Sequence, residues 1–322
     1  MNKLPFHYRS SLASSQDRRA FLLNMLAAGA ALPLVGCTGG TSGKKPDKVW
    51  GERGITDGKL QKPRAMCIDQ DDLLYLVDIT ARIQVFDTDG KYLRGWRTPE
   101  SKNGRPTGMS IIDGWLYVAD THYFRVLVYS LDGQLNDERT FGQEGDGPGD
   151  LGWTTDIARD SAGNLYVSEY GKHDRVQKFA PDGTFLLQWG THGTEPGQFL
   201  RPQCLWVDEK DQVWVCDAGN HRLQVFDTEG AFLFTWGEEG IEPGQLSYPY
   251  SMWIDHQDQV LVCEYGNSRV QKLTRKGEPV AMWGDVGREP GQLHNPWAIV
   301  QDSKKKTYVL DSYNHRVQQF RI

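Results

Sequence analysis

The sequence lacks the motifs that mark several common functional classes. It has no uninterrupted apolar run of the roughly 20 residues that a transmembrane helix needs, and its 5 cysteines show no zinc-binding spacing. It also has no Gly-x-Ser-x-Gly motif, no phosphate-binding loop and no recognisable Cys-His order. We therefore predict no metal and no cofactor, and no motif here predicts a catalytic residue.

The sequence also lacks an excess of positive charge. Its 36 Lys and Arg residues stand against 42 Asp and Glu residues, a net charge of −6. An acidic surface repels phosphate backbones, so we do not expect nucleic acid as a partner. Glycine (35), tryptophan (11) and tyrosine (13) are abundant. Many turn residues together with many aromatic residues are typical of an all-β chain.

The first residues resemble an export signal. Arg18 and Arg19 precede an apolar run, 22–35, that is too short to span a membrane, as in twin-arginine signal peptides. The run ends in Leu-Val-Gly-Cys, which resembles a bacterial lipobox and implies cleavage before Cys37. The alternative is a buried N-terminal helix with an unrelated cysteine.

This resemblance implies a division of the chain into three parts. Residues 1–36 are a signal peptide, residues 37–48 are a lipidated Cys37 and a flexible tether, and residues 49–322 are the folded domain. Residues 1–36 have a net charge of +3, so their removal changes the net charge from −6 to −9. We expect an exported protein, lipid-anchored to a bacterial envelope membrane on its periplasmic or outer face.

The remaining cysteines lie in apolar, strand-like runs. Buried free thiols are therefore favoured over disulfides, although an exported protein would permit disulfides. They are Cys67, Cys204, Cys216 and Cys263.

One short element recurs six times along the chain. An acidic residue is followed, four to six residues later, by an Arg that begins an apolar run, as in DAGNHRLQVF at 217–226. Successive arginines are 43, 50, 47, 47 and 47 residues apart, a period typical of four-stranded propeller blades. The six pairs are Asp78 and Arg82, Asp120 and Arg125, Glu169 and Arg175, Asp217 and Arg222, Glu264 and Arg269, and Asp311 and Arg316.

Each repeat reads as four short strands, and the chain ends after the third strand of the sixth repeat. The missing strand is supplied by Val49–Gly51, whose Trp-Gly ending matches the fourth strand of other repeats. We therefore predict an all-β, six-bladed β-propeller of four-stranded blades, closed by this N-terminal strand in the last blade. Closure also hides sheet edges that would otherwise pair with other chains.

The element Asp-x-x-Asn-His-Arg-Leu-Gln-x-Phe, together with the loop Gly-x-x-Pro-Gly-Gln-Leu, resembles the NHL-repeat family of six-bladed propellers. The resemblance covers about residues 49–322 and is strongest in the last three repeats. The family includes a zinc-dependent lyase of peptide amidation, whose metal histidines follow the proline of the inner strands. None of the matching positions here is His: they are Arg64, Thr107, Thr155, Gln203, Tyr250 and Trp297.

The repeated acid and Arg are predicted to be structural, because a catalytic residue is needed once and these occur in every repeat. We expect an ion pair that braces the turn between the second and third strands. Residues that differ between blades on the same face are better ligand-binding candidates. These are Arg64, Gln203, Tyr250 and Trp297 at the mouth of the central channel, and Tyr170, Tyr265 and Tyr313 on adjacent turns.

The sequence thus predicts a monomeric binding or scaffold module for a protein, peptide or glycan partner. Two alternatives stay open at this point. Tyr250 and Trp297 would simply fill the channel mouth in one. In the other, the protein is a propeller enzyme, a lyase or hydrolase with its active site at the channel mouth. Such an enzyme could work with or without a metal ion.

Overall fold

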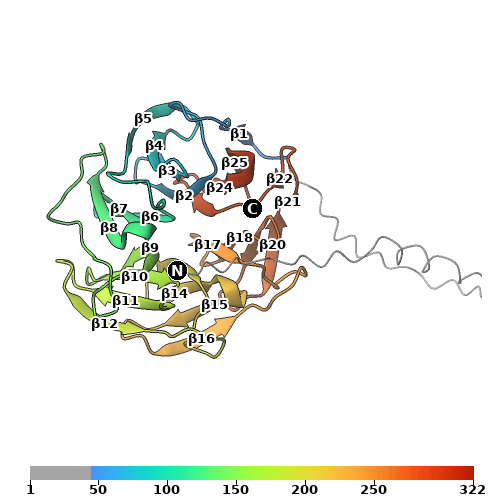
Figure 1. Ribbon diagram of the computed structural model, residues 1–322. Helices are drawn as coiled ribbons and strands as arrows, with labels where there is room; N and C mark the ends of the chain where they lie inside the picture. The colour runs from blue at the N-terminus through green and yellow to red at the C-terminus, as the bar shows by residue number, and fades with distance from the viewer. Residues whose placement is uncertain (1–44) are drawn as a thin grey trace, which may run out of the picture. The chain divides into compact units, whose positions relative to one another are not determined.

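The structure, a computed structural model, describes residues 45–322, which form a six-bladed β-propeller (Figure 1). The predicted signal peptide, Cys37 and most of the predicted tether lie outside the described residues. Within the described part of the chain, no helix is long and apolar enough to cross a membrane.

The strands of a blade run outwards from the centre in chain order, except that the outer strand of blade 6 is β1 from the N-terminal end of the domain. The inner strands are β2 (Pro63–Ile68), β6 (Gly108–Ile112), β9 (Trp153–Arg159), β13 (Pro202–Val207), β17 (Pro249–Ile254) and β23 (Ala298–Gln301). The second strands are β3 (Leu74–Asp78), β7 (Trp115–Asp120), β10 (Leu165–Tyr170), β14 (Val213–Asp217), β18 (Val260–Glu264) and β24 (Thr307–Asp311). The third strands are β4 (Arg82–Phe86), β8 (Arg125–Ser130), β11 (Arg175–Phe179), β15 (Arg222–Phe226), β19 (Arg269–Leu273) and β25 (Arg316–Phe320). The outer strands are β5 (Tyr92–Arg97), β12 (Phe185–Trp189), β16 (Phe232–Trp236), β20 (Pro279–Trp283) and β1 (Lys48–Trp50).

Short elements complete the blades. Single 3-10 turns connect the second and third strands in three blades, and a two-stranded parallel pair lies between blades 5 and 6. These elements are η1 (Thr121–Tyr123), η2 (Ala218–Asn220), η3 (Ser312–Asn314), β21 (Asp285–Val286) and β22 (Gln292–Leu293).

The predicted closure of the ring is confirmed. Strand β1 pairs antiparallel with β25, with Lys48 opposite Gln319 and Trp50 opposite Val317. The last blade therefore has the strand order β1-β25-β24-β23, built from both ends of the described chain. Trp50 also packs into a buried cluster with Phe86 of blade 1, so the closing strand contributes to the core between blades 6 and 1.

Blade 2 departs from the regular pattern. Its sheet has three strands, and the fourth is represented by two isolated bridges, Tyr129 with Leu135 and Val126 with Phe141. The cause is a turn inside the outer segment, where the Thr140 amide donates a hydrogen bond to the Asn136 carbonyl. The outer strand of this blade is therefore split in the middle.

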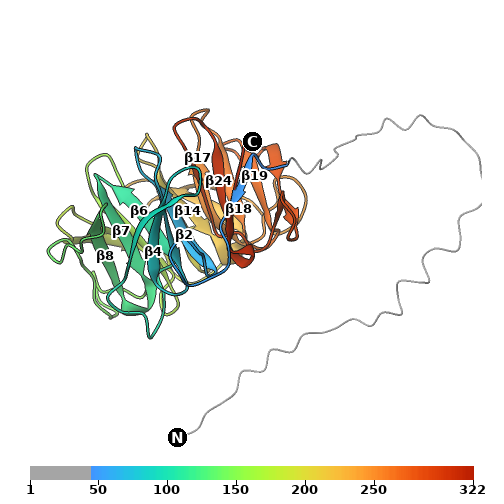
Figure 2. The same cartoon turned by 90° about the horizontal axis from the view of Figure 1, so that it is seen from above.

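The hydrophobic core lies mainly between neighbouring blades. Between blades 1 and 2, for example, Val77 and Ile83 share one buried cluster with Leu116 and Val118. The inner strands pack around a central channel, and strands of adjacent blades such as β2 and β6 lie side by side when seen from above (Figure 2). The four cysteines of the domain are buried and unpaired, as expected from their apolar surroundings.

Candidate functional site

The turns after the second strands and the loops that enter the inner strands open on one face of the propeller, which we call the signature face. In blade 4, the Arg222 Nε donates to an Asp217 carboxylate oxygen at 2.8 Å. The same guanidinium donates to the carbonyls of Thr194, Glu195 and Gln198 in the entering loop. The acid and the Arg together therefore fix the loop to the turn.

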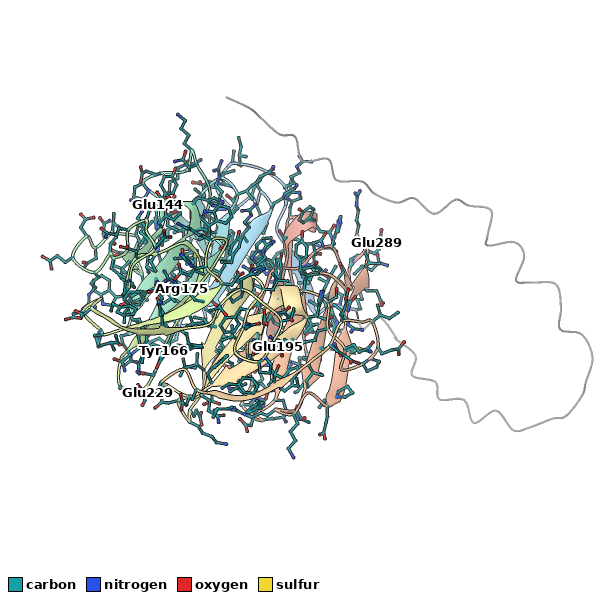
Figure 3. All side chains as sticks on the ribbon, turned by 60° about the horizontal axis from the view of Figure 1, so that its bottom comes forward. Glu144, Tyr166, Arg175, Glu195, Glu229 and Glu289 are labelled. Carbon is teal, nitrogen blue, oxygen red and sulfur yellow. The ribbon has the colours of Figure 1, made fainter. Side chains whose placement is uncertain are left out.

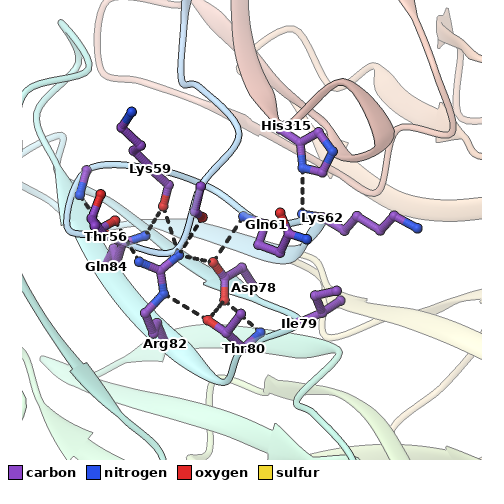
Figure 4. A network of polar contacts seen from close by, with 12 residues as sticks. Thr56, Lys59, Gln61, Lys62, Asp78, Ile79, Thr80, Arg82, Gln84 and His315 are labelled. Carbon is purple, nitrogen blue, oxygen red and sulfur yellow. Dashed lines mark hydrogen bonds and ion pairs between the residues drawn. The ribbon is translucent and has the colours of Figure 1, made fainter.

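The same ion pair is present in every blade, at N···O distances from 2.5 to 3.0 Å. All six acids are at most 1% exposed. Figure 4 shows the version in blade 1, where Arg82 bridges Asp78 and the carbonyls of the entering loop. We call this unit the brace.

A glutamine two residues after the Arg completes the brace in five blades, a role that the sequence analysis missed. In blade 4, the Gln224 side chain donates to the Gln198 carbonyl and to Asp217, and accepts the Gly197 amide. Blade 2 has Leu127 at this position. There Arg125 pairs with Asp120 and Glu100, and burial raises the pKa of Asp120 to about 6.

The residue before the brace Arg links neighbouring blades. Its side chain accepts a backbone amide from the next blade: His315 accepts from Lys62 at 2.9 Å (Figure 4), and His221 accepts from Tyr248 at 3.2 Å. Ser268 and Asp174 do the same in two other blades. Four blades therefore use a hydrogen-bond acceptor here, and any of His, Ser or Asp supplies it, whereas Ala81 and Phe124 in blades 1 and 2 cannot.

The inner strands present two rings of residues at the signature-face end of the channel. The first ring follows the proline position and is Arg64, Thr107, Thr155, Gln203, Tyr250 and Trp297. The second ring is Ala65, Gly108, Asp156, Cys204, Ser251 and Ala298. A cavity of about 40 Å³, which we call the channel mouth, is lined by all of the second ring and five members of the first.

Asp156 is the one carboxylic acid in these two rings, and the sequence analysis did not select it. It is 8% exposed and accepts the Leu205 amide at 3.0 Å. Burial raises the pKa of Asp156 to about 7, against the opposing effect of its hydrogen bonds.

The structure brings the seven predicted ligand-binding residues together around the channel mouth. Tyr250 stacks on Tyr265 with ring centroids 4.4 Å apart, and both contact Trp297. Tyr265 also contacts Tyr313, and Arg64 lies 5.5 Å from the Trp297 ring. Gln203 lines the cavity.

Their exposure differs. Gln203, Tyr250 and Trp297 are 3%, 5% and 9% exposed, whereas Tyr313 is 37% exposed. The side chains of Tyr250 and Trp297 belong to the core cluster between blades 6 and 1. They thus form the wall of the mouth, while Tyr313 faces outwards.

Two more cations at the mouth were missed by the sequence analysis. Arg201 lies 5.0 Å from the Tyr170 ring and 5.6 Å from the Tyr250 ring, and Lys62 lies 4.5 Å from the Tyr313 ring. Both residues directly precede the proline of an inner strand. Aligning the repeats one position earlier would have found them, since this position holds a cation in three blades.

A larger hollow adjoins the mouth between blades 2 and 3. It has a volume of about 550 Å³ and is lined by Phe124, Trp153, Tyr170, Lys172 and His173, among others. Trp153 is 40% exposed and contacts Tyr170 edge to face. Tyr170 lines the hollow, and the Arg201 guanidinium lies over its ring between the hollow and the channel mouth.

Among residues 45–322, no group of three or more His, Cys, Asp or Glu side chains is arranged to hold a metal ion. The six positions matching the metal histidines of the amidating lyase form the first ring, and none supplies an imidazole.

Comparison with known proteins agrees with the architecture. The NHL repeat profile matches residues 199–226, which contain the entering loop and the brace of blade 4. Together with the six-bladed fold, this match supports an NHL-repeat β-propeller.

Known proteins and solved structures match longer parts of the chain than the family profile does. NHL repeat-containing protein 3 of Mus musculus is 29% identical over 174 residues, covering 48% of this chain and 50% of that protein. The chain thus spans about half the length of this relative. Peptidyl-glycine alpha-amidating monooxygenase A of Xenopus laevis is 36% identical over 74 residues, 21% of this chain and 8% of that protein. The crystal structure of virginiamycin B lyase from Staphylococcus aureus matches with a TM-score of 0.56 at 13% identity, covering 81% of this chain and 80% of that one.

Proposed function

We propose that this protein is an exported, lipid-anchored binding module that holds a protein, peptide or glycan partner on its signature face. One observation carries the proposal. Three large aromatic side chains around the channel mouth are exposed to solvent: Trp153 (40%), Tyr248 (41%) and Tyr313 (37%). Aromatic residues of this kind are enriched at recognition surfaces.

The aromatic residues are held in place by their neighbours. Trp153 contacts both Tyr170 and His122, and Tyr248 contacts His221 with ring centroids 4.6 Å apart. Side chains that are already ordered lose little conformational entropy on binding a partner. The hollow beside Trp153 gives a partner a concave surface next to the mouth.

The strand order supports an orientation relative to the membrane. Arg316 lies in the brace at the signature face, and β25 runs from there to the opposite face. Because Lys48 pairs with Gln319 near the far end of β25, β1 begins at the opposite face. A lipid on Cys37, predicted from the sequence alone, would therefore leave the signature face pointing away from the membrane.

Quantitative cross-linking in the native envelope tests this proposal. We expect one or more partners to be captured by the wild type and lost in Trp153→Ala and Tyr313→Ala. Leu186→Ala is the matched control, because Leu186 is a 46% exposed apolar residue on the outer strand β12. Equal capture by all variants would show that the signature face is not the binding surface.

An enzyme that uses the same mouth is the second candidate. The observation that favours it is Asp156, an acid with a pKa near 7 that lines the cavity below the first ring. An enzyme predicts that Asp156→Asn abolishes turnover of a captured ligand while leaving its affinity within a few-fold. Metal analysis of the purified protein would test the metal-dependent version.

A further inference from the structure

Charge is distributed unevenly over the signature face. Although the chain has a net charge of −6, Arg64, Arg201 and Lys62 lie at the channel mouth. Burial, and then the charges of Arg105 and Arg201, lower the pKa of the Arg64 guanidinium, so these three arginines lie close enough to one another to interact. Exposed acids lie on the loops of separate blades, as Glu144, Glu195 and Glu289 show in Figure 3.

The cations at the mouth have no carboxylate partner within residues 45–322. Arg64 makes neither an ion pair nor a hydrogen bond there, and its guanidinium lies over the Trp297 ring. Arg201 contacts two tyrosine rings, and its Nε is buried without a hydrogen-bond partner. The acid nearest to Arg201 in the hydrogen-bond network, Asp174, accepts the Arg201 backbone amide and pairs with His192. A partly buried guanidinium without a partner raises the free energy of the folded state, unless a ligand pairs with its charge and accepts its hydrogen bonds.

Two further polar atoms at the mouth lack partners. The Gln203 Oε1 is buried and accepts no hydrogen bond, although the residue is only 3% exposed. The Trp297 Nε1 is likewise buried and donates to no atom of the described chain. The mouth therefore brings together unused donors, unpaired cations and one unused acceptor around a single cavity.

We propose that the channel mouth binds the C-terminal carboxylate of a peptide chain. The inference rests on the proposed function, since it specifies the ligand of the same face. The planar guanidinium of Arg64 suits a carboxylate, with Arg201 adding a second positive charge. The last amide N–H of a peptide lies next to that carboxylate and provides the donor that Gln203 Oε1 lacks.

The size of the mouth favours a chain end over a sugar. Its volume is about 40 Å³, far below the roughly 150 Å³ of an engineered protein cavity that binds benzene. A carboxylate group therefore fits, but a six-membered sugar ring does not. Tyr265 and Tyr313, beside the mouth, then supply apolar surface for the last side chains of the peptide.

The test uses two libraries of N-acetylated tetrapeptides, one with free C-terminal carboxylates and one with C-terminal amides. We expect the free-carboxylate library to raise the melting temperature of the intact domain and the amide library to leave it unchanged. Titration calorimetry with the best peptide should then show Arg64→Gln weakening binding by about tenfold or more, as for a hydrogen bond to a charged group. Arg288→Gln is the matched control, since Arg288 is an exposed cation on a signature-face loop and should stay within twofold.

Several results would overturn the inference. They are equal binding of the two libraries, binding of uronic acid oligomers instead of peptides, or equal losses in Arg64→Gln and Arg288→Gln. If Arg64→Gln still captured the envelope partner that Tyr313→Ala loses, the carboxylate inference would fail while the proposed function stood.

Discussion

Two sets of arginines lie on the same face of this propeller and are bonded in opposite ways. Each brace Arg, such as Arg222, pairs with a fully buried acid, and in most blades it also donates to loop carbonyls. Arg64 and Arg201, at the channel mouth, pair with no acid of the described chain and lie against aromatic rings. The residue type alone therefore does not separate a structural arginine from a candidate binding arginine. The two sets differ in whether the protein itself satisfies their hydrogen bonds.

Repetition explains the difference. All six blades must fix an entering loop to a turn, so the brace recurs with each blade. A ligand at the centre of the ring meets all six blades at once, so each blade can contribute a different side chain. The first ring, with Arg64, Gln203, Tyr250 and Trp297, is correspondingly varied.

The largest effect on stability is expected when a brace Arg is replaced. Arg222→Met leaves Asp217 buried without its charge partner, and we expect a loss of about 3–5 kcal/mol in the free energy of unfolding. Burial already raises the pKa of Asp217 despite its hydrogen bonds. Arg222 lowers that pKa, so without Arg222 the pKa of Asp217 rises further and the folded variant has to hold a proton or a bare buried charge. The loss should therefore grow as pH rises from 5 to 8. Urea denaturation at both pH values measures it.

Blade 2 provides the internal control for the brace. Arg125 pairs with Asp120 and Glu100 and makes none of the bonds to loop carbonyls that Arg222 makes. Arg125→Met should therefore destabilise the protein less than Arg222→Met. Equal losses would mean that the carbonyl contacts add nothing to the brace.

The next prediction concerns Asp156, the acid of the channel. Its folded-state pKa is about 7, against about 3.9 for an unfolded Asp. Between these values the folded state binds more proton than the unfolded state, so Asp156 lowers stability as pH rises from about 4 to 7. Asp156→Asn keeps an acceptor for the Leu205 amide and should be more stable than the wild type at pH 8, by on the order of 1–3 kcal/mol.

The same measurement at pH 4 should bring Asp156→Asn and the wild type together. Asp71→Asn, at an exposed position, is the control and should follow the wild type at both pH values. An Asn variant without any gain at pH 8 would place Asp156 in a more solvated position than the structure does.

The fold was predictable because it is periodic, and parts of the site were predictable for the same reason. The brace positions stand out in the sequence by recurring, and Val49–Gly51 stands out by supplying the missing Trp-Gly strand. Comparing blades also selected Arg64, at a position that varies directly after a proline present in five of the six blades. Asp156 and Arg201 were missed because what distinguishes them is burial and unused hydrogen bonds, which depend on how six inner strands meet.

The irregular outer strand of blade 2 was missed for a related reason. The sequence around Phe141 keeps enough of the pattern to suggest a strand, but the Asn136 turn interrupts it through local hydrogen bonds. Local side-chain bonds of Asn compete with strand pairing in a way that periodicity does not reveal.

A smaller effect is expected at the contact between blades 6 and 1. His315→Ala removes the acceptor of the Lys62 amide, a loss of about 0.5–1.5 kcal/mol. The backbone tolerates the change, because Ala81 has nearly the same φ (59°) as His315 (58°). Burial, and then the charges of Arg53 and Lys62, lower the pKa of His315 below 6.5. The unfolded state therefore takes up a proton first as pH falls, and wild-type stability should drop below pH 6.5.

That acid-side drop should be smaller in His315→Ala, as thermal melts at pH 7.5 and 5.5 would show. His256→Ala, at an exposed position, should keep the wild-type slope. If the slope were unchanged in His315→Ala, another group would be responsible for it.

The smallest effect on stability is expected at Arg64, and there the comparison becomes sharpest. Because Arg64 makes no hydrogen bond or ion pair within the described chain, and an unpaired, partly buried charge disfavours folding, Arg64→Gln should not lower the free energy of unfolding. The same substitution should remove most peptide binding. A brace substitution should do the reverse, lowering stability while the fraction that remains folded still binds. If Arg64→Gln instead destabilised the protein as much as Arg125→Met, Arg64 would have a structural role like the six brace arginines. The lack of hydrogen-bond partners within the protein would then no longer identify the arginine that binds a ligand.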